Sequence, residues 1–131
     1  MSKLEYSRSA GIITYFANDG NQYPYPCSCD FEEGYNDDGV PRASLPIGSY
    51  TANAEQPPTD YGPAYGTFYI NTDDIRSRVI HGGGTSLPDP YAPRQGWLCT
   101  YGCLRMQNED GEQLSNLMIA DGNNVPLEVK K

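Results

Sequence analysis

The stretch GWLCTYGCLRM, residues 96–106, contains Cys99 and Cys103, two of the four cysteines of the chain. Two cysteines at this spacing could form a disulfide, contribute to a metal site or include one reactive thiol. Gly102 precedes Cys103 and would let backbone N–H groups turn towards its sulfur. Arg105 follows and offers a planar fork of donors suited to a carboxylate. These neighbours favour Cys103 as a nucleophile, whereas Cys99 has none of them.

The only histidine of the chain, His81, follows the apolar residues Val79 and Ile80 and precedes three consecutive glycines. An imidazole near a thiol lowers the pKa of the thiol and can accept its proton. A strand that ends in a glycine-rich turn can hold such a base rigidly and still leave it accessible. We therefore expect His81 to act on Cys103. The alternative is a structural histidine beside a flexible turn.

These two segments together resemble the signature of the L,D-transpeptidase catalytic domain, the YkuD family. That signature has a His-Gly pair, a spacer, and then Ser/Thr-x-Gly-Cys, an aliphatic residue and Arg or Asn. The stretch PIGSY, residues 46–50, is similar to the Pro-x-Gly-x-Tyr strand of the family, and the resemblance spans residues 10–130. The residues that match the signature are His81, Gly82, Thr100, Gly102, Cys103, Leu104 and Arg105.

The chain departs from the family pattern in two places. The spacer between His81 and Cys103 is longer than usual, and it carries several prolines and Trp97. Tyr101 stands where many members have a second histidine. The second departure puts an acid or base role for position 101 in doubt, whereas His81 keeps the position of the base.

The resemblance implies cysteine acyl transfer on the tetrapeptide stems of peptidoglycan, without a cofactor. His81 would deprotonate Cys103, which would attack the carbonyl of the L-centre of meso-diaminopimelate and expel D-alanine. The acyl group would then pass to an amine or to water. L,D-transpeptidation, D-amino-acid exchange and L,D-carboxypeptidase activity therefore all remain open as outcomes.

The resemblance also implies supporting roles. Backbone groups around the two candidate residues would orient the imidazole and stabilise the oxyanion, and Arg105 would hold a carboxylate of the stem peptide. Trp97 and Tyr65 are candidates for the peptide groove, while Tyr69 is expected in the core because it lies on a predicted strand. The expected backbone positions are Gly82, Gly83, Tyr101 and Gly102, and the expected substrate-binding residues are Arg105, Thr100, Trp97 and Tyr65.

The pattern along the chain predicts a mainly β fold with one short helix. Fourteen Gly and eleven Pro bound several short apolar runs, which is typical of strands joined by turns. Asp110 is the expected N-cap of the helix, in which Leu114, Leu117 and Met118 share one face before Gly122 ends it. We expect a single domain over residues 1–131, built as an L,D-transpeptidase-type sandwich or partly closed barrel. The predicted strands are residues 11–16, 46–52, 66–71, 77–80 and 125–129.

Three other site types are weaker interpretations of the sequence. Zinc sites use more widely spaced pairs than Cys27-Ser28-Cys29, so no metal is expected. A disulfide from Cys27 or Cys29 to Cys99 stays open, with Cys99 packed behind the site as the default. The run after His81 also resembles the oxyanion segment of lipases, but the chain contains no G-x-S-x-G motif.

The net charge of −8 argues against nucleic acid and anionic membranes as partners, and no apolar run is long enough to insert into a bilayer. The first residues lack the apolar core of a secretory signal, so we expect synthesis in the cytoplasm and delivery to the periplasm by a non-Sec route. A small acidic domain of this kind resembles the antibacterial effectors of type VI secretion, which would imply a secretion apparatus and a cognate immunity protein as partners. The alternatives are a housekeeping 3–3 cross-linking enzyme and a non-catalytic peptidoglycan-binding module of the same fold.

Overall fold

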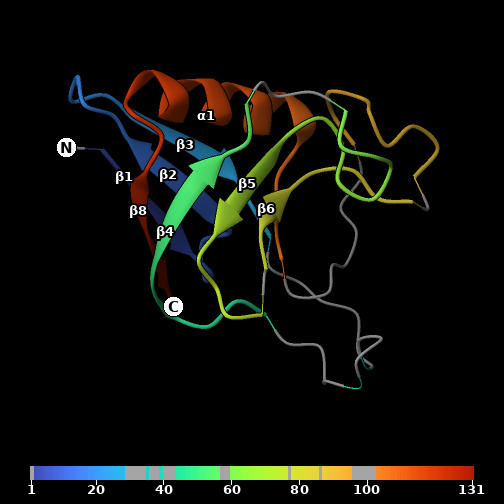
Figure 1. Ribbon diagram of the computed structural model, residues 1–131, viewed down its shortest axis with the longest axis horizontal. Coiled ribbons are helices and arrows are strands. Elements are labelled where there is room, and N and C mark those ends of the chain that lie inside the picture. The colour runs from blue at the N-terminus through green and yellow to red at the C-terminus, as the bar shows by residue number, and fades with distance from the viewer. Residues whose placement is uncertain are drawn as a thin grey trace.

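The computed structural model describes residues 2–28, 35, 39, 44–56, 60–76, 78–85, 87–95 and 103–131. Within these residues the chain forms one sheet and one helix, which lie against each other (Figure 1). The elements are β1 (Lys3–Ser7), β2 (Ile12–Phe16), β3 (Gln22–Pro26), β4 (Gly48–Ala54), β5 (Tyr69–Thr72), β6 (Ile80–His81), β7 (Leu104–Arg105), α1 (Asn108–Ala120) and β8 (Val125–Lys130).

The sheet has the strand order β3-β2-β1-β8-β4-β5-β6-β7. Two neighbouring pairs, β1 with β8 and β6 with β7, are parallel, and the other described pairs are antiparallel. The edge strand β3 contains Pro24 and Pro26. Proline has no backbone N–H to donate, so an edge is where a sheet tolerates it.

The two ends of the sheet meet at one point. Ser28, which follows β3, forms an isolated antiparallel bridge with Arg105 of β7. The N–H of Ser28 donates to the carbonyl of Arg105 over 2.9 Å, and the N–H of Arg105 donates back over 2.7 Å. The sheet is therefore curled into a half-barrel that this bridge partly closes, which confirms the mainly β fold predicted from the sequence.

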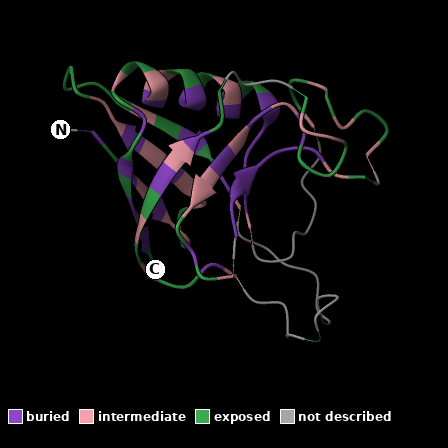
Figure 2. Cartoon of the chain, in the orientation of Figure 1, coloured by how far each residue is buried: buried purple, intermediate pink, exposed green. Residues whose placement is uncertain are grey.

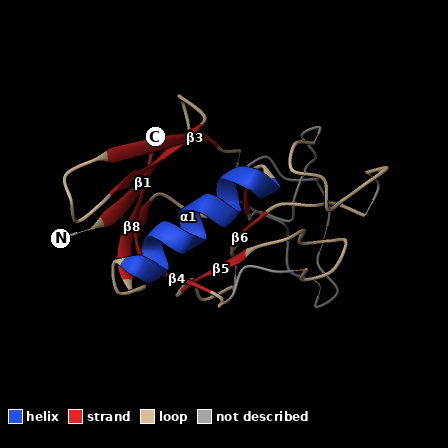
Figure 3. Cartoon of the chain, turned by 90° about the horizontal axis from the view of Figure 1, so that it is seen from above, coloured by secondary structure: helices blue, strands red, loops and turns tan. Residues whose placement is uncertain are grey.

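The core lies between the concave face of the sheet and α1 (Figures 2 and 3). Strand β8 alternates strictly between buried and exposed residues, as expected when one face of a strand packs and the other faces solvent. The helix presents Leu114 and Met118 to the sheet, and both are fully buried. Beside them Gly111 lies against the ring of Phe68, which leaves no room for a larger residue.

The structure shifts several predicted boundaries. The helix begins at Asn108 with Gln107 as its N-cap, so the prediction of Asp110 as N-cap is wrong. Asp110 lies in the first turn instead, where a carboxylate is favourable near the helix N-terminus and where both its oxygens bind Arg94 at 2.9 Å. Strands β1, β3 and β7 were not predicted, and β6 is shorter and lies further along the chain than the predicted strand.

Candidate active site

Three neighbouring strands place the candidate residues on one face of the sheet. Tyr69 of β5 lies opposite His81 of β6, which lies opposite Arg105 of β7. Cys103 comes two residues before Arg105 and immediately before β7, and continued alternation of side chains would put it on this same face. The residues between them face the opposite way and belong to the core: Ile70, Ile80 and Leu104.

The imidazole of His81 is held by the residue that follows it. Its Nδ1 lies 2.6 Å from the carbonyl oxygen of Gly82. A carbonyl can only accept, so this contact places the ring proton on Nδ1 and leaves Nε2 with its lone pair. The ring is only 7% exposed, and Tyr65 packs edge-on against it with ring centroids 5.3 Å apart.

The surroundings of His81 favour its neutral form. Burial lowers the pKa of the imidazole, and the nearby Arg105 cation lowers it further, although the bond to Gly82 acts in the opposite direction. A neutral imidazole with a free Nε2 is the state that a general base requires.

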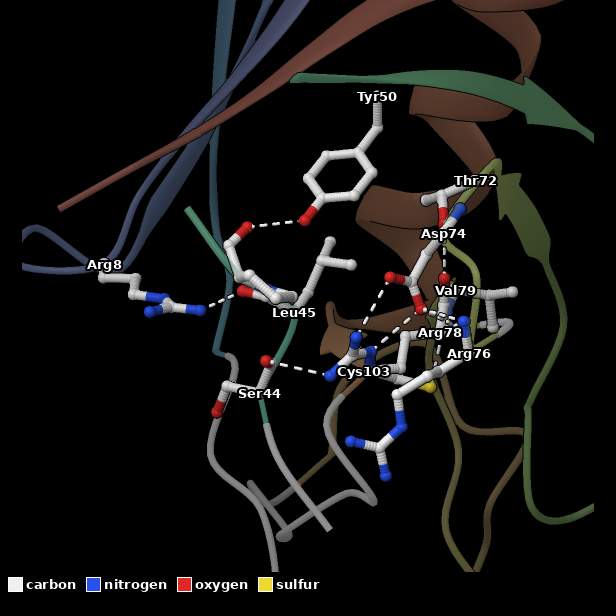
Figure 4. Close-up of polar contacts among 11 residues, drawn as sticks. Arg8, Ser44, Leu45, Tyr50, Thr72, Asp74, Arg76, Arg78, Val79 and Cys103 are labelled. Carbon is white, nitrogen blue, oxygen red and sulfur yellow. Dashed lines mark hydrogen bonds and ion pairs between the residues drawn. The ribbon is translucent and has the colours of Figure 1, made fainter. Parts of the chain in front are cut away.

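Cys103 lies immediately before β7, beside the residue that precedes β6. The N–H of Val79 donates to its Sγ over 3.4 Å (Figure 4). Burial raises the pKa of the thiol, while the Val79 bond and the Arg78 cation lower it and the Asp74 carboxylate raises it. The balance leaves the pKa above its ordinary value, so the resting sulfur is a thiol.

A buried ion pair supports the segment that presents the Val79 N–H. Arg78 binds Asp74 through two bonds, Nε to Oδ2 at 2.9 Å and Nη2 to Oδ1 at 3.0 Å, and the two side chains are 8% and 4% exposed. Asp74 Oδ2 also accepts the backbone N–H groups of Arg76 and Arg78, each at 3.1 Å. Arg78 Nη1 donates to the carbonyl of Ser44 over 3.1 Å (Figure 4). These buried bonds of Asp74 and Arg78 therefore hold the loop between β5 and β6 in place.

The glycines after His81 pack closely against the loop of residues 63–66. Gly83 has a φ of +70°, and a side chain there would clash with the backbone of Gly66. The N–H of Gly82 donates to the carbonyl of Tyr65 over 3.0 Å, and that of Gly83 donates to Gln95 Oε1 over 3.1 Å. Both donors are used within the protein, so Gly82 orients the imidazole through its carbonyl and neither glycine offers its N–H to an oxyanion.

The position of Arg105 differs from the one that the family resemblance implies. Its side chain is 1% exposed. Both Nε and Nη2 donate to the carbonyl of Gly83, at 3.1 and 2.8 Å, and Nη2 also donates to Gln95 Oε1 at 2.9 Å. These contacts hold the glycine turn in place, whereas a residue that binds a substrate carboxylate would direct its donors outward.

Two buried polar residues, Asn108 and Gln107, and the partly buried Gln95 complete this support, and none of them was predicted from the sequence. Asn108 at the start of α1 is fully buried, and its Oδ1 accepts the N–H of Thr67 over 3.2 Å. Its Nδ2 donates to the carbonyls of Pro90 and Ala92 at 2.9 and 2.8 Å. Gln107 and Gln95 bond each other through side chain and backbone. No spacing signal in the sequence marks these residues, because their partners are far away along the chain.

Several predicted positions lie outside the described residues. Of the candidates for substrate binding and for the backbone roles, the structure describes Gly82, Gly83, Arg105 and Tyr65, and Tyr65 is 40% exposed. The structure describes no group of three His, Cys, Asp or Glu side chains that could hold a metal ion, and no helix in its described part is long and apolar enough to cross a membrane. The predicted positions that are not described are Trp97, Thr100, Tyr101, Gly102, Cys29 and Cys99.

Known structures share this fold. An L,D-transpeptidase from Xylanimonas cellulosilytica superposes with a TM-score of 0.63 at 16% identity, covering 98% of this chain and 59% of that chain. L,D-transpeptidase 1 of Mycobacterium tuberculosis gives 0.57 at 14% identity, covering 99% and 61%. The cell shape determining protein Pgp2 of Campylobacter jejuni gives 0.61 at 17% identity, covering 99% and 48%. The chain thus spans about half to three fifths of the length of these proteins.

No curated protein sequence matches the chain. The family model of the L,D-transpeptidase catalytic domain, YkuD, matches residues 4–126, which is nearly the whole sequence. This match covers the helix and the strands, except for the first residue of β1 and all but the first two residues of β8. The chain therefore belongs to the YkuD family of L,D-transpeptidase catalytic domains.

Proposed function

We propose that this domain is a cysteine acyltransferase that acts on the tetrapeptide stems of peptidoglycan, with Cys103 as nucleophile and His81 as base. One observation carries the proposal. The bond from His81 Nδ1 to the Gly82 carbonyl leaves Nε2 able to accept a proton, and His81 lies opposite Arg105, two residues after the cysteine of the family motif. Family membership supports the substrate class.

The reaction follows from the states of the two groups. The Sγ proton of Cys103 passes to Nε2 of His81 as the sulfur attacks the carbonyl carbon of the donor peptide bond. When the tetrahedral intermediate collapses, the C–N bond breaks and the imidazolium gives its proton to the departing D-alanine amine. An acceptor amine or water then attacks the thioester carbon and gives its proton to His81. The C–S bond breaks, and the imidazolium returns a proton to the released sulfur, which restores the thiol.

The neutral resting pair is compatible with this sequence of steps. With the thiol pKa raised and the imidazole pKa lowered, the proton stays on sulfur until a substrate arrives. A substrate that excludes water and supplies a developing negative charge near the imidazolium would make the transfer favourable. In this proposal the enzyme therefore ionises its nucleophile during the reaction.

The direct test is release of D-alanine from purified tetrapeptide muropeptides, with intact mass spectrometry of the protein to detect the acyl-enzyme. We expect wild type to release D-alanine and to gain the mass of the donor minus D-alanine. Cys103→Ala should do neither, and His81→Gln should fall by about 10²-fold or more. Full activity in Cys103→Ala would overturn the proposal, and muropeptide binding with no release by wild type would favour the non-catalytic module.

We extend the proposal to an antibacterial role, with action in the periplasm after export by a non-Sec route. The support is the resemblance of this small acidic domain to type VI secretion effectors. The test is expression in a sensitive bacterium, with and without an added periplasmic leader. Growth arrest only with the leader, and only with Cys103 intact, is expected. Normal growth together with increased 3–3 cross-links would favour the housekeeping enzyme. A neighbouring gene whose product relieves the arrest would identify the immunity protein.

A further inference from the structure

A pocket of about 220 Å³ opens beside the proposed active site. Its described lining consists of Glu55, Tyr61, Tyr65 and Tyr69. Glu55 follows β4 and Tyr69 begins β5, and the N–H of Glu55 donates to the Tyr69 carbonyl over 2.9 Å. The pairing of these two strands therefore fixes the acidic side of the pocket against the aromatic side.

The three tyrosines form one aromatic cluster. The Tyr61 and Tyr69 ring centroids lie 5.8 Å apart, and those of Tyr65 and Tyr69 lie 5.3 Å apart with the rings at 74°. Tyr69 is half-buried and lines this pocket, so the expectation that it belongs to the core is wrong. Burial and the neighbouring Glu55 raise the pKa of Tyr61 and Tyr69, which keeps both phenols neutral at physiological pH.

Glu55 supplies the only formal charge among the described lining residues. Its Oε1 accepts the side-chain amide of Asn71 over 2.6 Å, which holds the carboxylate in place. A carboxylate beside electron-rich ring faces repels anions and attracts cations. An apolar ligand would leave the carboxylate unused, and a phosphate or carboxylate ligand would meet a like charge. The chemistry of the lining thus selects a cation.

The pocket is connected to the reacting groups. Tyr65 packs on His81, and Tyr69 lies opposite His81 in the sheet. Cys103 in turn accepts the N–H of Val79, two residues before His81, so the nucleophile lies beside the same strand. A side chain bound there would belong to the same peptide that reaches Cys103.

We propose that this pocket binds a primary ammonium group on a side chain of the substrate peptide, with Glu55 as its counter-ion and the rings of Tyr61, Tyr65 and Tyr69 as its cation–π partners. The proposal rests on the proposed function, because it takes the peptide to be the one that acylates Cys103. The distal end of diaminopimelate carries such a group together with a carboxylate, and the proposal requires the ammonium to face Glu55 and the carboxylate to point out of the pocket. The pocket would recognise that ammonium group and so determine which carbonyl of the peptide lies at Cys103.

The test measures binding separately from chemistry, using the Cys103→Ala variant. Two synthetic stem peptides are compared by isothermal titration calorimetry or NMR titration, one with a free side-chain amine and one with that amine acetylated. We expect the free amine to bind about three- to tenfold more tightly, the range for an exposed cation–π contact combined with an exposed ion pair. Adding Glu55→Gln or Tyr61→Leu should remove most of this preference.

A matched control uses Glu128, which is exposed on β8 and outside the pocket. Glu128→Gln removes the same charge and should leave the preference intact. Equal affinity for the two peptides in Cys103→Ala, including no binding of either, would overturn the pocket proposal. Failure of the proposed function is a different result, namely no D-alanine release by wild type, and it would leave an amine-selective binding site standing.

Discussion

The backbone N–H of Val79 donates to Cys103 Sγ over 3.4 Å, so the strand that carries the proposed base also contacts the proposed nucleophile. This bond lowers the pKa of the thiol but does not outweigh burial. We therefore predict that, without substrate, alkylation of Cys103 by iodoacetamide accelerates only as the pH rises above the ordinary thiol range. Peptide-resolved mass spectrometry separates Cys103 from the other cysteines.

The alternative resting state makes a different prediction for the same experiment. A preformed thiolate–imidazolium pair would give fast alkylation already at about pH 6, which His81→Gln would abolish. The neighbouring ion pair provides an internal check. Arg78→Met leaves the Asp74 carboxylate and should move the alkylation midpoint to higher pH, whereas Asp74→Asn leaves the Arg78 cation and should move it lower.

The Asp74–Arg78 pair should make stability depend on acid pH. Burial alone would raise the pKa of Asp74, but the bonds and the charge of Arg78 outweigh it and lower that pKa in the folded protein. The stabilisation that the ionised Asp74 gives to the fold is therefore complete above the unfolded pKa of about 3.9, and it is lost as the pH falls through the folded pKa. Arg78→Met strands a buried carboxylate and should cost about 3–5 kcal/mol at pH 7. This cost should shrink at pH 3, because Asp74 becomes protonated in the variant once Arg78 no longer holds its charged form. Urea unfolding at both pH values measures it.

A double variant shows whether the loss of stability in Arg78→Met comes from an unpaired buried charge or from lost packing. Replacing both members, as in Asp74→Leu with Arg78→Met, should cost less than Arg78→Met alone. Equal or greater cost in the double variant would mean that packing, and not an unpaired charge, dominates at this position.

Gly83→Ala should destabilise the protein and reduce activity together. A Cβ at Gly83 would lie 2.9 Å from both Gly66 Cα and the Pro63 carbonyl, at a φ of +70°. Gly20 offers a matched control, because its φ is +89° but nothing lies within 4 Å of its added Cβ. Gly20→Ala should cost only the backbone strain of about 1–2 kcal/mol. Equal losses of Tm in the two variants would contradict the close packing of the glycine turn.

Gly111→Ala should destabilise, although alanine is normally the better helix former by about 1 kcal/mol. The added methyl would overlap the ring of the fully buried Phe68, and overpacking typically costs about 1–3 kcal/mol. In a Phe68→Leu background the same change should become neutral or stabilising. Thermal unfolding of the four proteins of this cycle measures the coupling, and a gain from Gly111→Ala alone would disprove it.

Arg105→Lys separates two roles for this side chain. If the guanidinium holds the Gly83 carbonyl, as its two bonds there indicate, the variant should lose kcat and stability with little change in KM. A single ammonium cannot reproduce the fork that reaches both Gly83 and Gln95. A rise in KM with kcat and Tm unchanged would instead support the substrate-carboxylate role.

The sequence predicted the fold class and the two candidate reacting residues because both depend on local patterns. The motif around Cys103 is continuous along the chain, and the glycines after His81 mark a close backbone approach that the structure contains. The helix was found from its apolar face, but its start was misplaced. The N-cap residue Gln107 makes no side-chain capping bond, so no capping signal marks the start of the helix.

The supporting residues could not be predicted for a physical reason. Asp74 and Arg78 form a common spacing of opposite charges, and such pairs are usually exposed and weak. Only the burial of both makes this pair important, and burial depends on the whole fold. Gln95 and Arg105 likewise meet each other at Gly83, which is distant from both along the chain. The edge strand β3 was missed because its two prolines argue against a strand.

The bridge between Ser28 and Arg105 bears on how the active site comes into being. The strand that follows Cys103 is tied to Ser28 at the end of β3, and β3 is connected through β2 and β1 to β8, which lies about a hundred residues further along the chain. Contacts between such distant segments form late and slowly. The segment that carries Cys103 would therefore take up its final position only after these long-range contacts have formed, so that closure of the whole sheet precedes assembly of the proposed active site.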